Sequence, residues 1–122
     1  MVRETKKIFN NDEIGVTATC VRVPVMRGHS ESIYVELKED YQLEEVKTLF
    51  AQQEGLVVQD SIEEQLYPMP LQATDRTEVF VGRIRPDLHH PRGLNFWVVS
   101  DNLLKGAATN TIQIAEALIE RD

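Results

Sequence analysis

The segment 102–122, NLLKGAATNTIQIAEALIERD, constrains the fold more than any other part of this chain. On a helical wheel it has one narrow polar stripe, formed by Lys105, Thr109, Gln113, Glu116 and Glu120. The apolar side chains around the rest are Leu103, Leu104, Ala107, Ala108, Ile112, Ile114, Ala115, Leu118 and Ile119. A helix with so wide an apolar surface requires burial on most of its sides. The pattern favours a helix that packs on a second domain or another subunit, and the alternative is a core helix of a compact domain.

Short runs rich in β-branched and aromatic residues predict the strands of a sheet. In the run 30–38, Ile33, Val35 and Leu37 alternate with polar residues and share one face. The expected strands are 15–23, 30–38, 56–59, 78–85 and 94–100. A turn over 86–93 joins the last two.

Two further helices are expected. Residues 2–9 are mostly charged helix formers that end at a polar stretch, and they have the character of the last turns of a helix whose beginning is missing. Residues 42–55 place four apolar side chains on one face and carry Gly55 as a C-terminal stop. These four are Leu43, Val46, Leu49 and Phe50. Strands interrupted by single helices predict an α+β fold with a mostly antiparallel or mixed sheet that helices cover on one side.

Length and composition are those of one globular domain: 122 residues, 42% hydrophobic and 27% charged. The 13 Lys and Arg against 20 Asp and Glu give a formal net charge of −7, which is opposite in sign to what a polyphosphate partner requires. Nucleic acid is therefore not an expected partner. Apolar runs fall far short of the roughly 18 residues of a spanning helix, and the N-terminus lacks a signal core. We expect a cytoplasmic protein without a membrane segment.

The single cysteine, Cys20, excludes an internal disulfide and fits a reducing compartment. It lies in a β-rich run, where a free cysteine usually behaves as a small buried apolar residue. The alternative is a nucleophile paired with His29. His89 and His90 share a turn with no third ligand nearby, so no metal site is expected.

The stretch 19–35, TCVRVPVMRGHSESIYV, predicts a hairpin around PVMRG. If its strands pair residue 23 with residue 28, Arg22 lies opposite His29 on the same face. A guanidinium binds a carboxylate through two parallel hydrogen bonds, and an imidazole exchanges a proton near neutral pH. The pair is therefore a candidate site for a small carboxylate substrate, with Arg22 as the binding group and His29 as the acid or base. An exposed or structural pair is the alternative.

Three stretches, CVRVPVMRGHSES, FVGRIR and WVVSDNLLKGAATNTIQIAE, closely resemble the C-terminal part of bacterial aspartate-β-semialdehyde dehydrogenases. The resemblance covers essentially the whole chain. It implies the α+β C-terminal domain of enzymes similar to glyceraldehyde-3-phosphate dehydrogenase, assembled as a homodimer or homotetramer. It also implies NADPH-dependent reductive dephosphorylation of β-aspartyl phosphate to aspartate semialdehyde, on the route to lysine, threonine, methionine and diaminopimelate.

By position, the resemblance implies roles for three residues. Arg22 would bind the substrate carboxylate, His29 would be the general acid and base that serves the catalytic thiol, and Asn102 would reach the nicotinamide end of the NADP cofactor. The resemblance also divides the chain into two parts. Residues 1–100 would be a substrate-binding and dimerisation domain without its N-terminal part, and 101–122 a helix that packs on an absent nucleotide-binding domain.

The chain departs from the family in three ways. The nucleophilic cysteine of the family lies in an Asn-Cys segment that has no match here, and Cys20 is not that residue. The glycines never take the spacing of a dinucleotide-binding turn. The substrate-binding Glu and the phosphate-binding Lys of the family also have no match. We therefore expect the chain to be inactive alone; the alternatives are a stand-alone noncatalytic dimerisation or interaction module and a noncatalytic paralogue.

Overall fold

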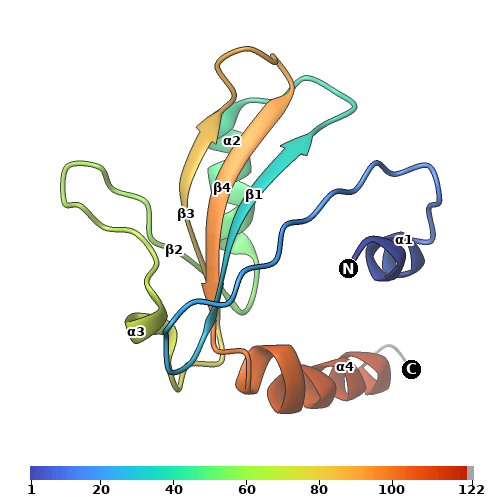
Figure 1. The fold of residues 1–122 in the computed structure, drawn as a ribbon, viewed down its shortest axis with the longest axis vertical. Helices are drawn as coiled ribbons and strands as arrows, with labels where there is room; N and C mark the ends of the chain where they lie inside the picture. The colour runs from blue at the N-terminus through green and yellow to red at the C-terminus, as the bar shows by residue number, and fades with distance from the viewer. Residues whose placement is uncertain (121–122) are drawn as a thin grey trace.

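A computed structural model describes residues 1–120 and shows one mixed sheet with helices around it (Figure 1). Along the chain the elements are α1 (Val2–Phe9), β1 (His29–Glu36), α2 (Leu43–Gln52), β2 (Leu56–Val58), α3 (Pro70–Ala73), β3 (Val79–Pro86), β4 (Gly93–Ser100), the π-helical turn η1 (Leu104–Ala108) and α4 (Thr109–Ile119). The expected α+β fold is confirmed.

The sheet has the order β1-β4-β3-β2. Strands β1 and β4 pair antiparallel along their whole length, from His29 opposite Ser100 to Glu36 opposite Gly93. Strands β3 and β4 are also antiparallel, whereas β2 runs parallel to β3. The prediction of a mostly antiparallel sheet therefore holds, with one parallel edge.

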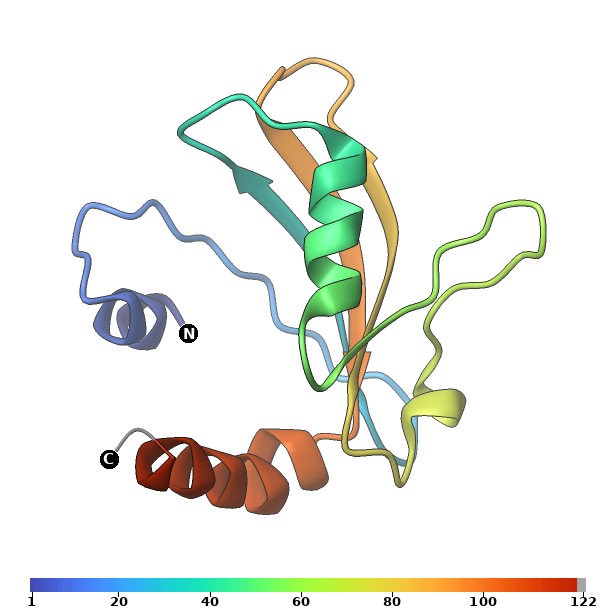
Figure 2. The same cartoon turned by 180° about the vertical axis from the view of Figure 1, so that it is seen from behind.

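Helix α2 covers one face of the sheet (Figure 2). Beneath it Val81, Ile84 and Leu94 form a buried cluster, against which Phe50 of α2 and Phe96 of β4 pack. The rings of Phe50 and Phe96 meet edge to face with 5.7 Å between their centroids. The amphipathic pattern thus predicted the covering helix, except that Leu49 points away from the sheet and is exposed.

A second, smaller cluster lies on the other face. It consists of Ala73 from α3, Phe80 from β3 and Val99 from β4, with Trp97 packed beside it. The backbone of Gln59 runs beside β3, where its N–H donates to the Val81 carbonyl oxygen at 2.8 Å, and a Cβ added at Gly82 would overlap the Gln59 carbonyl oxygen. Only glycine allows this approach, so the position anchors the 59–68 segment to β3.

The expected strand over 15–23 is wrong, and so is the hairpin built on it. Residues 14–23 are extended and form no ladder with any strand of the described chain, and His29 pairs instead with Ser100. High β propensity describes a side chain that fits a pleated surface, but a strand also requires a neighbour that supplies hydrogen bonds. Here the segment runs free from α1 to the base of the sheet (Figure 1).

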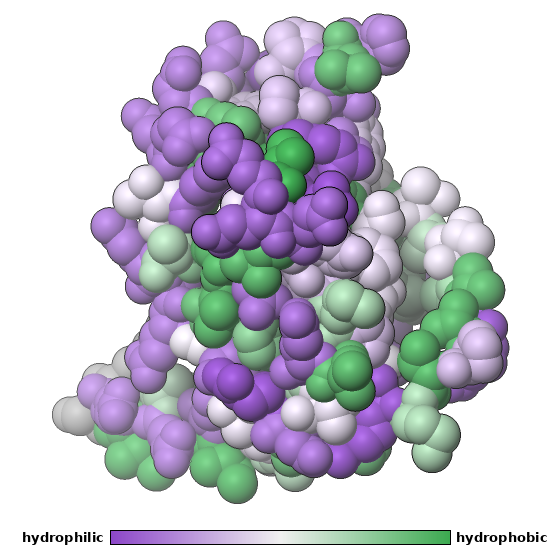
Figure 3. Space-filling view, turned by 90° about the vertical axis from the view of Figure 1, so that its left-hand side faces the viewer, coloured by the Kyte–Doolittle hydropathy of each residue, from purple (hydrophilic) through white to green (hydrophobic). Residues whose placement is uncertain are grey.

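The two terminal helices lie to one side of the sheet, and neither contains a buried residue (Figures 1 and 2). On α4 the side chains of Ile112, Ile114, Leu118 and Ile119 are all more than half exposed. Apolar side chains are visible along the lower edge of Figure 3, where Figure 1 places α4. The expected helix is present up to residue 119, and the end of the predicted range, 121–122, lies outside the described residues. No helix formed by residues 1–120 has both the length and the apolar character needed to span a bilayer.

Candidate functional site

The structure brings two of the three predicted site residues to the same place, the end of β4 and the beginning of β1. His29 is the first residue of β1 and pairs with Ser100, the last residue of β4. Asn102 follows two residues later, and its Oδ1 accepts a hydrogen bond of 2.9 Å from the backbone N–H of Gly28. Asn102 is therefore joined to the residue that directly precedes His29.

The backbone conformation at this junction favours glycine at position 28. The Gly28 φ of +94° lies in a region that side-chain-bearing residues rarely adopt. A Cβ there would lie in ordinary van der Waals contact, at 3.4 Å, with the Pro70 Cβ and the Ser100 carbonyl oxygen. The turn into β1 is thus closely packed, which fixes where the backbone of His29 begins.

Asp101, between these residues, is fully buried. Its Oδ2 accepts the backbone N–H of Asp75 at 2.9 Å, and its Oδ1 accepts those of Leu103 at 2.9 Å and Leu104 at 3.4 Å. These hydrogen bonds, above all the one from Asp75, hold the pKa of the Asp101 carboxyl below its usual value, against the opposing effect of burial. The side chain remains ionised at neutral pH and joins β4, η1 and the loop after α3.

The charge of Asp101 is balanced by Arg27. Its Nη2 lies 3.0 Å from Asp101 Oδ2, and its Nη1 lies 2.5 Å from Asp75 Oδ1. The remaining nitrogen, Nε, is buried without a hydrogen-bond partner among residues 1–120. Sequence analysis missed Arg27, Asp75 and Asp101, although Arg27 and Asp101 directly flank Gly28 and Asn102 in the segments RGH and SDN.

The third predicted residue, Arg22, lies apart from the sheet. It is exposed on the extended segment and forms no ion pair with another described residue. Because 15–23 is not a strand, the predicted cross-strand contact between Arg22 and His29 is absent here. Both side chains are exposed, so both are accessible to a ligand.

Cys20 does not occupy the buried position that we expected. It is exposed on the same extended segment, and its Sγ lies 3.2 Å from the Met1 Sδ. Neither a carboxylate nor an imidazole contacts this thiol among the described residues, so the geometry gives no support to Cys20 as a nucleophile.

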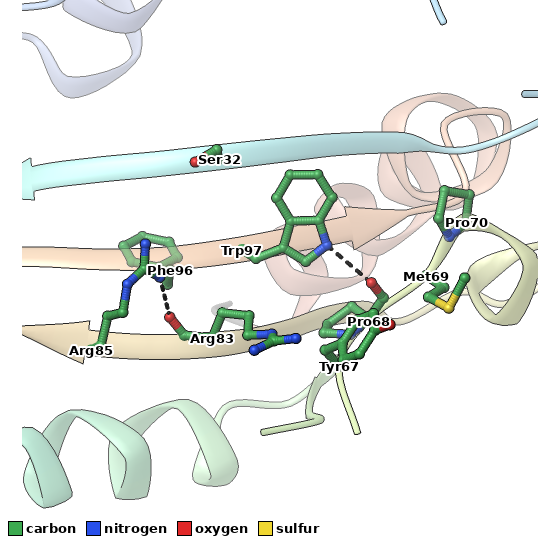
Figure 4. Close-up of a pocket in the computed structure, with 9 residues that line it drawn as sticks. All are labelled: Ser32, Tyr67, Pro68, Met69, Pro70, Arg83, Arg85, Phe96 and Trp97. Atoms are coloured by element: carbon green, nitrogen blue, oxygen red, sulfur yellow. Dashed lines mark hydrogen bonds between the residues drawn. The ribbon is translucent and has the colours of Figure 1, made fainter. Parts of the chain in front are cut away.

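A separate groove of about 580 Å³ lies on the sheet face opposite α2 (Figure 4). Its floor includes Trp97, whose Nε1 donates to the Pro68 carbonyl oxygen at 3.0 Å. Arg83, held at a φ of +54° in the β3 bulge, places its guanidinium 4.5 Å from the centre of the Tyr67 ring. The groove is open and aromatic, and it contains none of the predicted site residues.

Within residues 1–120, no three His, Cys, Asp or Glu side chains gather as a metal site would require. His89 and His90 lie in a turn. The Asp87 Oδ1 accepts the backbone N–H groups of both residues, each at 2.9 Å. These bonds explain the positions of the two histidines in structural terms.

The chain is similar to a family of known proteins and to several of their solved structures. Residues 1–105 match the family described as semialdehyde dehydrogenase, dimerisation domain. The aspartate-semialdehyde dehydrogenase of Bacillus subtilis is 52% identical over 119 residues, which are 97% of this chain and 34% of that protein. The enzyme of the same name from Aquifex aeolicus is 49% identical over 120 residues, 98% of this chain and 35% of the relative. The chain thus spans about a third of the length of the curated relatives that it matches.

Solved structures agree. A crystal structure of aspartate semialdehyde dehydrogenase II from Vibrio cholerae, complexed with ASA, superposes with a TM-score of 0.90 at 44% identity and covers 98% of this chain and 35% of that one. The Francisella tularensis aspartate semialdehyde dehydrogenase gives a TM-score of 0.84 at 30% identity over 96% of this chain and 33% of that one. The resemblance seen in the sequence is confirmed, and the chain belongs to the semialdehyde dehydrogenase family through its dimerisation domain.

Proposed function

We propose that this chain is the substrate-binding and dimerisation part of an aspartate-semialdehyde dehydrogenase and that it is inactive alone. The whole enzyme would convert β-aspartyl phosphate, NADPH and a proton into aspartate semialdehyde, NADP⁺ and phosphate. The observation that carries the proposal is the Gly28 N–H to Asn102 Oδ1 hydrogen bond of 2.9 Å, because it joins the candidate acid-base residue His29 to the candidate cofactor contact. The names of the relatives supply the reaction.

His29 is suited to proton transfer. Its ring is exposed at the first position of β1, and its backbone is held on both sides by the ladder to Ser100 and by the Gly28 turn. An imidazole gives and takes protons near neutral pH, so His29 would serve a thiol contributed by another part of the enzyme. Cys20 is not proposed as that thiol.

Arg22 is suited to a substrate carboxylate. Its guanidinium is exposed, and no described carboxylate pairs with it. A free guanidinium can bind a carboxylate through two parallel hydrogen bonds, which fix its orientation. Arg22 would approach His29 once the extended segment is held by the rest of the enzyme and by substrate.

The residues of this chain fit one end of the cofactor only. Asn102 uses Oδ1 for Gly28, while its Nδ2 makes no hydrogen bond to another described residue and can donate to a carboxamide oxygen. Such a contact would orient the nicotinamide, and bound NADPH would supply the hydride. The phosphates of the cofactor find no glycine-rich turn in this sequence, so they would be bound elsewhere in the enzyme.

The proposed partners are a second copy of this chain, as homodimer or homotetramer, and a nucleotide-binding domain against α4. The family description as a dimerisation domain and the exposed apolar residues of α4 support these contacts, because apolar surface of this kind is stable when covered. A cytoplasmic location is part of the same proposal.

The test is a fusion of this chain to the preceding part of the Bacillus subtilis relative, assayed by NADP⁺ reduction with aspartate semialdehyde and phosphate. We expect activity in the fusion and none in the chain alone. His29→Gln should lower kcat by about 10²- to 10⁴-fold, whereas Arg22→Lys should mainly raise KM for the semialdehyde. His89→Gln, in the distant turn, is the matched control and should leave both unchanged.

Two outcomes would contradict the proposal. Turnover by the chain alone that is lost in Cys20→Ser would make Cys20 the nucleophile. A fusion that folds and dimerises but has no activity would favour the alternative of a noncatalytic dimerisation module of the same family.

A further inference from the structure

We propose that Asp101 is a positioning residue that holds His29 and Asn102 in register, acting through Arg27 and the backbone of Gly28. The inference rests on the proposed function for the roles of His29 and Asn102. Its physical content, a clamp between residues 100–102 and residues 27–29, can be tested without any enzyme activity.

The clamp consists of three connections between two short segments. Ser100 pairs with His29 in the β1/β4 ladder. Asp101 binds the Arg27 guanidinium at 3.0 Å, and Asn102 accepts the Gly28 N–H at 2.9 Å. Each residue of one segment therefore has one partner in the other, and Asp101 is the only charged member on its side.

Burial makes the Asp101 connection the strong one. Asp101 is fully buried, whereas Asp75, the other carboxylate at Arg27, is 74% exposed. An exposed ion pair contributes little, but a buried carboxylate that loses its partner leaves an uncompensated charge. Loss of Asp101 should therefore disturb Arg27 more than loss of Asp75, although Asp75 accepts the shorter hydrogen bond, and Asp75 serves as a natural comparison at the same guanidinium.

Asp101 also fixes Asn102 from its own side. Its Oδ1 accepts the N–H groups of Leu103 and Leu104 at the entrance to η1, and its carbonyl oxygen accepts the Lys105 N–H at 2.9 Å. The turn continues as a π-helix, in which the Ala108 N–H points to the Leu103 carbonyl oxygen, 3.4 Å away. The backbone that follows Asn102 is thus held by the side chain and the carbonyl oxygen of Asp101, and π-helical turns of this kind frequently occur at functional sites.

The experiment is NMR on the whole 122-residue chain, comparing Asp101→Asn with Asp75→Asn. An asparagine has the same shape but only one acceptor oxygen, so it cannot serve Arg27, Asp75 and η1 together. In Asp101→Asn we expect the Gly28 amide to exchange with solvent about tenfold faster, and the side-chain amide signals of Asn102 to move towards free asparagine. In Asp75→Asn the exchange rate of the Gly28 amide should stay within about twofold of that of the unchanged chain. The side-chain amide signals of Asn102 should not move.

The Val81 amide in the middle of β3 is the internal control, because its exchange follows the core and not the clamp. If Asp101→Asn fails to fold, Arg27→Gln replaces it, since this variant breaks the clamp and leaves the backbone hydrogen bonds of Asp101 intact. Faster Gly28 exchange with unchanged Val81 exchange supports the proposal. Gly28 and Asn102 signals that do not change in whichever variant folds, or that change equally in Asp75→Asn, overturn it.

Activity of the fused enzyme separates this inference from the proposed function. We expect Asp101→Asn to lower kcat about tenfold and to change the pH profile of kcat assigned to His29, with KM for the semialdehyde little altered. A fusion without any activity would refute the proposed function, and the exchange measurements would still decide the role of Asp101.

Discussion

The sheet region and the terminal segments of this molecule differ in how many of their side chains are buried. The sheet with α2 has buried clusters on both faces, whereas α1, the extended segment after it and α4 contain no buried residue. Two candidate site residues lie where the regions meet, His29 at the start of β1 and Asn102 after β4, whereas Arg22 lies apart on the extended segment. The stable region therefore fixes the backbone at His29 and Asn102, and the exposed region leaves Arg22 accessible.

The largest effect should come from the closest backbone approach in the stable region. Gly82→Ala would place a Cβ 2.1 Å from the Gln59 carbonyl oxygen and 2.7 Å from the Pro68 Cδ. We expect the free energy of unfolding to fall by at least about 5 kcal/mol, which is enough to unfold many domains. Gly15→Ala is the control, because nothing lies within 4 Å of that Cβ. Chemical denaturation measures both; equal stability of the two variants would contradict the packing at Gly82.

Matched phenylalanines compare the two regions directly. Phe80 in β3 is 3% exposed, whereas Phe9 at the end of α1 is 66% exposed. Phe80→Ala should cost about 3 to 5 kcal/mol of unfolding free energy through lost burial and a cavity. Phe9→Ala should cost less than about 0.5 kcal/mol. Similar losses in urea titrations would show that α1 packs on the sheet more than this structure indicates.

Acid should weaken two loops that contain a carboxyl with a lowered pKa, that of Glu78 before β3 and that of Asp101 after β4. The hydrogen bond from Arg76 lowers the pKa of Glu78 to about 2. A carboxyl whose pKa is lowered by folding stabilises the folded state at pH values above its pKa in the unfolded chain, which is 4.5 for Glu78. This stabilisation is lost as the pH falls towards 2. The Asp101 carboxyl, whose pKa is also lowered, acts in the same direction.

We therefore expect the urea midpoint to fall between pH 5 and pH 2, and to fall less steeply in Glu78→Gln. Glu63→Gln, an exposed residue without an ion pair to another described residue, should leave the slope unchanged. If the Glu78→Gln variant kept the original pH dependence, ionisation of Glu78 would not contribute to the acid sensitivity of the fold.

The smallest effect on stability is expected on α4. Leu118 is 61% exposed, so Leu118→Gln should change the free energy of unfolding by less than about 0.5 kcal/mol. The same change should reduce self-association in sedimentation experiments, because it removes exposed apolar surface. Leu94→Gln, in the core, is the opposite control and should be strongly destabilising. A large stability loss at Leu118 would place α4 in the stable region.

Most elements of the sheet were predictable, because alternation and helical spacing report burial on one face. Ile33 and Val35 are half-buried as expected, and Val46 and Phe50 of α2 pack on the sheet. Leu49 was predicted on the same face, but its side chain is exposed. The prediction of a strand at 15–23 was wrong for another reason. β propensity is a local property, whereas a strand also needs a neighbouring strand to supply its backbone hydrogen bonds.

The candidate site was predictable in part. His29 and Asn102 were identified by resemblance, and the structure joins them through Gly28, although their roles remain predictions. Arg27 and Asp101 carried no periodic signal, because a buried ion pair is recognised only when the two segments are placed side by side. The predicted contact of Arg22 with His29 depended on a hairpin register that no turn residue fixed.

By itself the sequence determined the α+β class and most of the apolar face of β1 and of α2, because spacing encodes which side chains leave water, and the family followed from its resemblance to known sequences. Only the tertiary structure decided that β1 pairs with β4, that 15–23 stays unpaired, and that Asp101 is buried and contacts Arg27. These are contacts between residues far apart in the chain. Their free energy depends on geometry and on partners that local sequence does not specify.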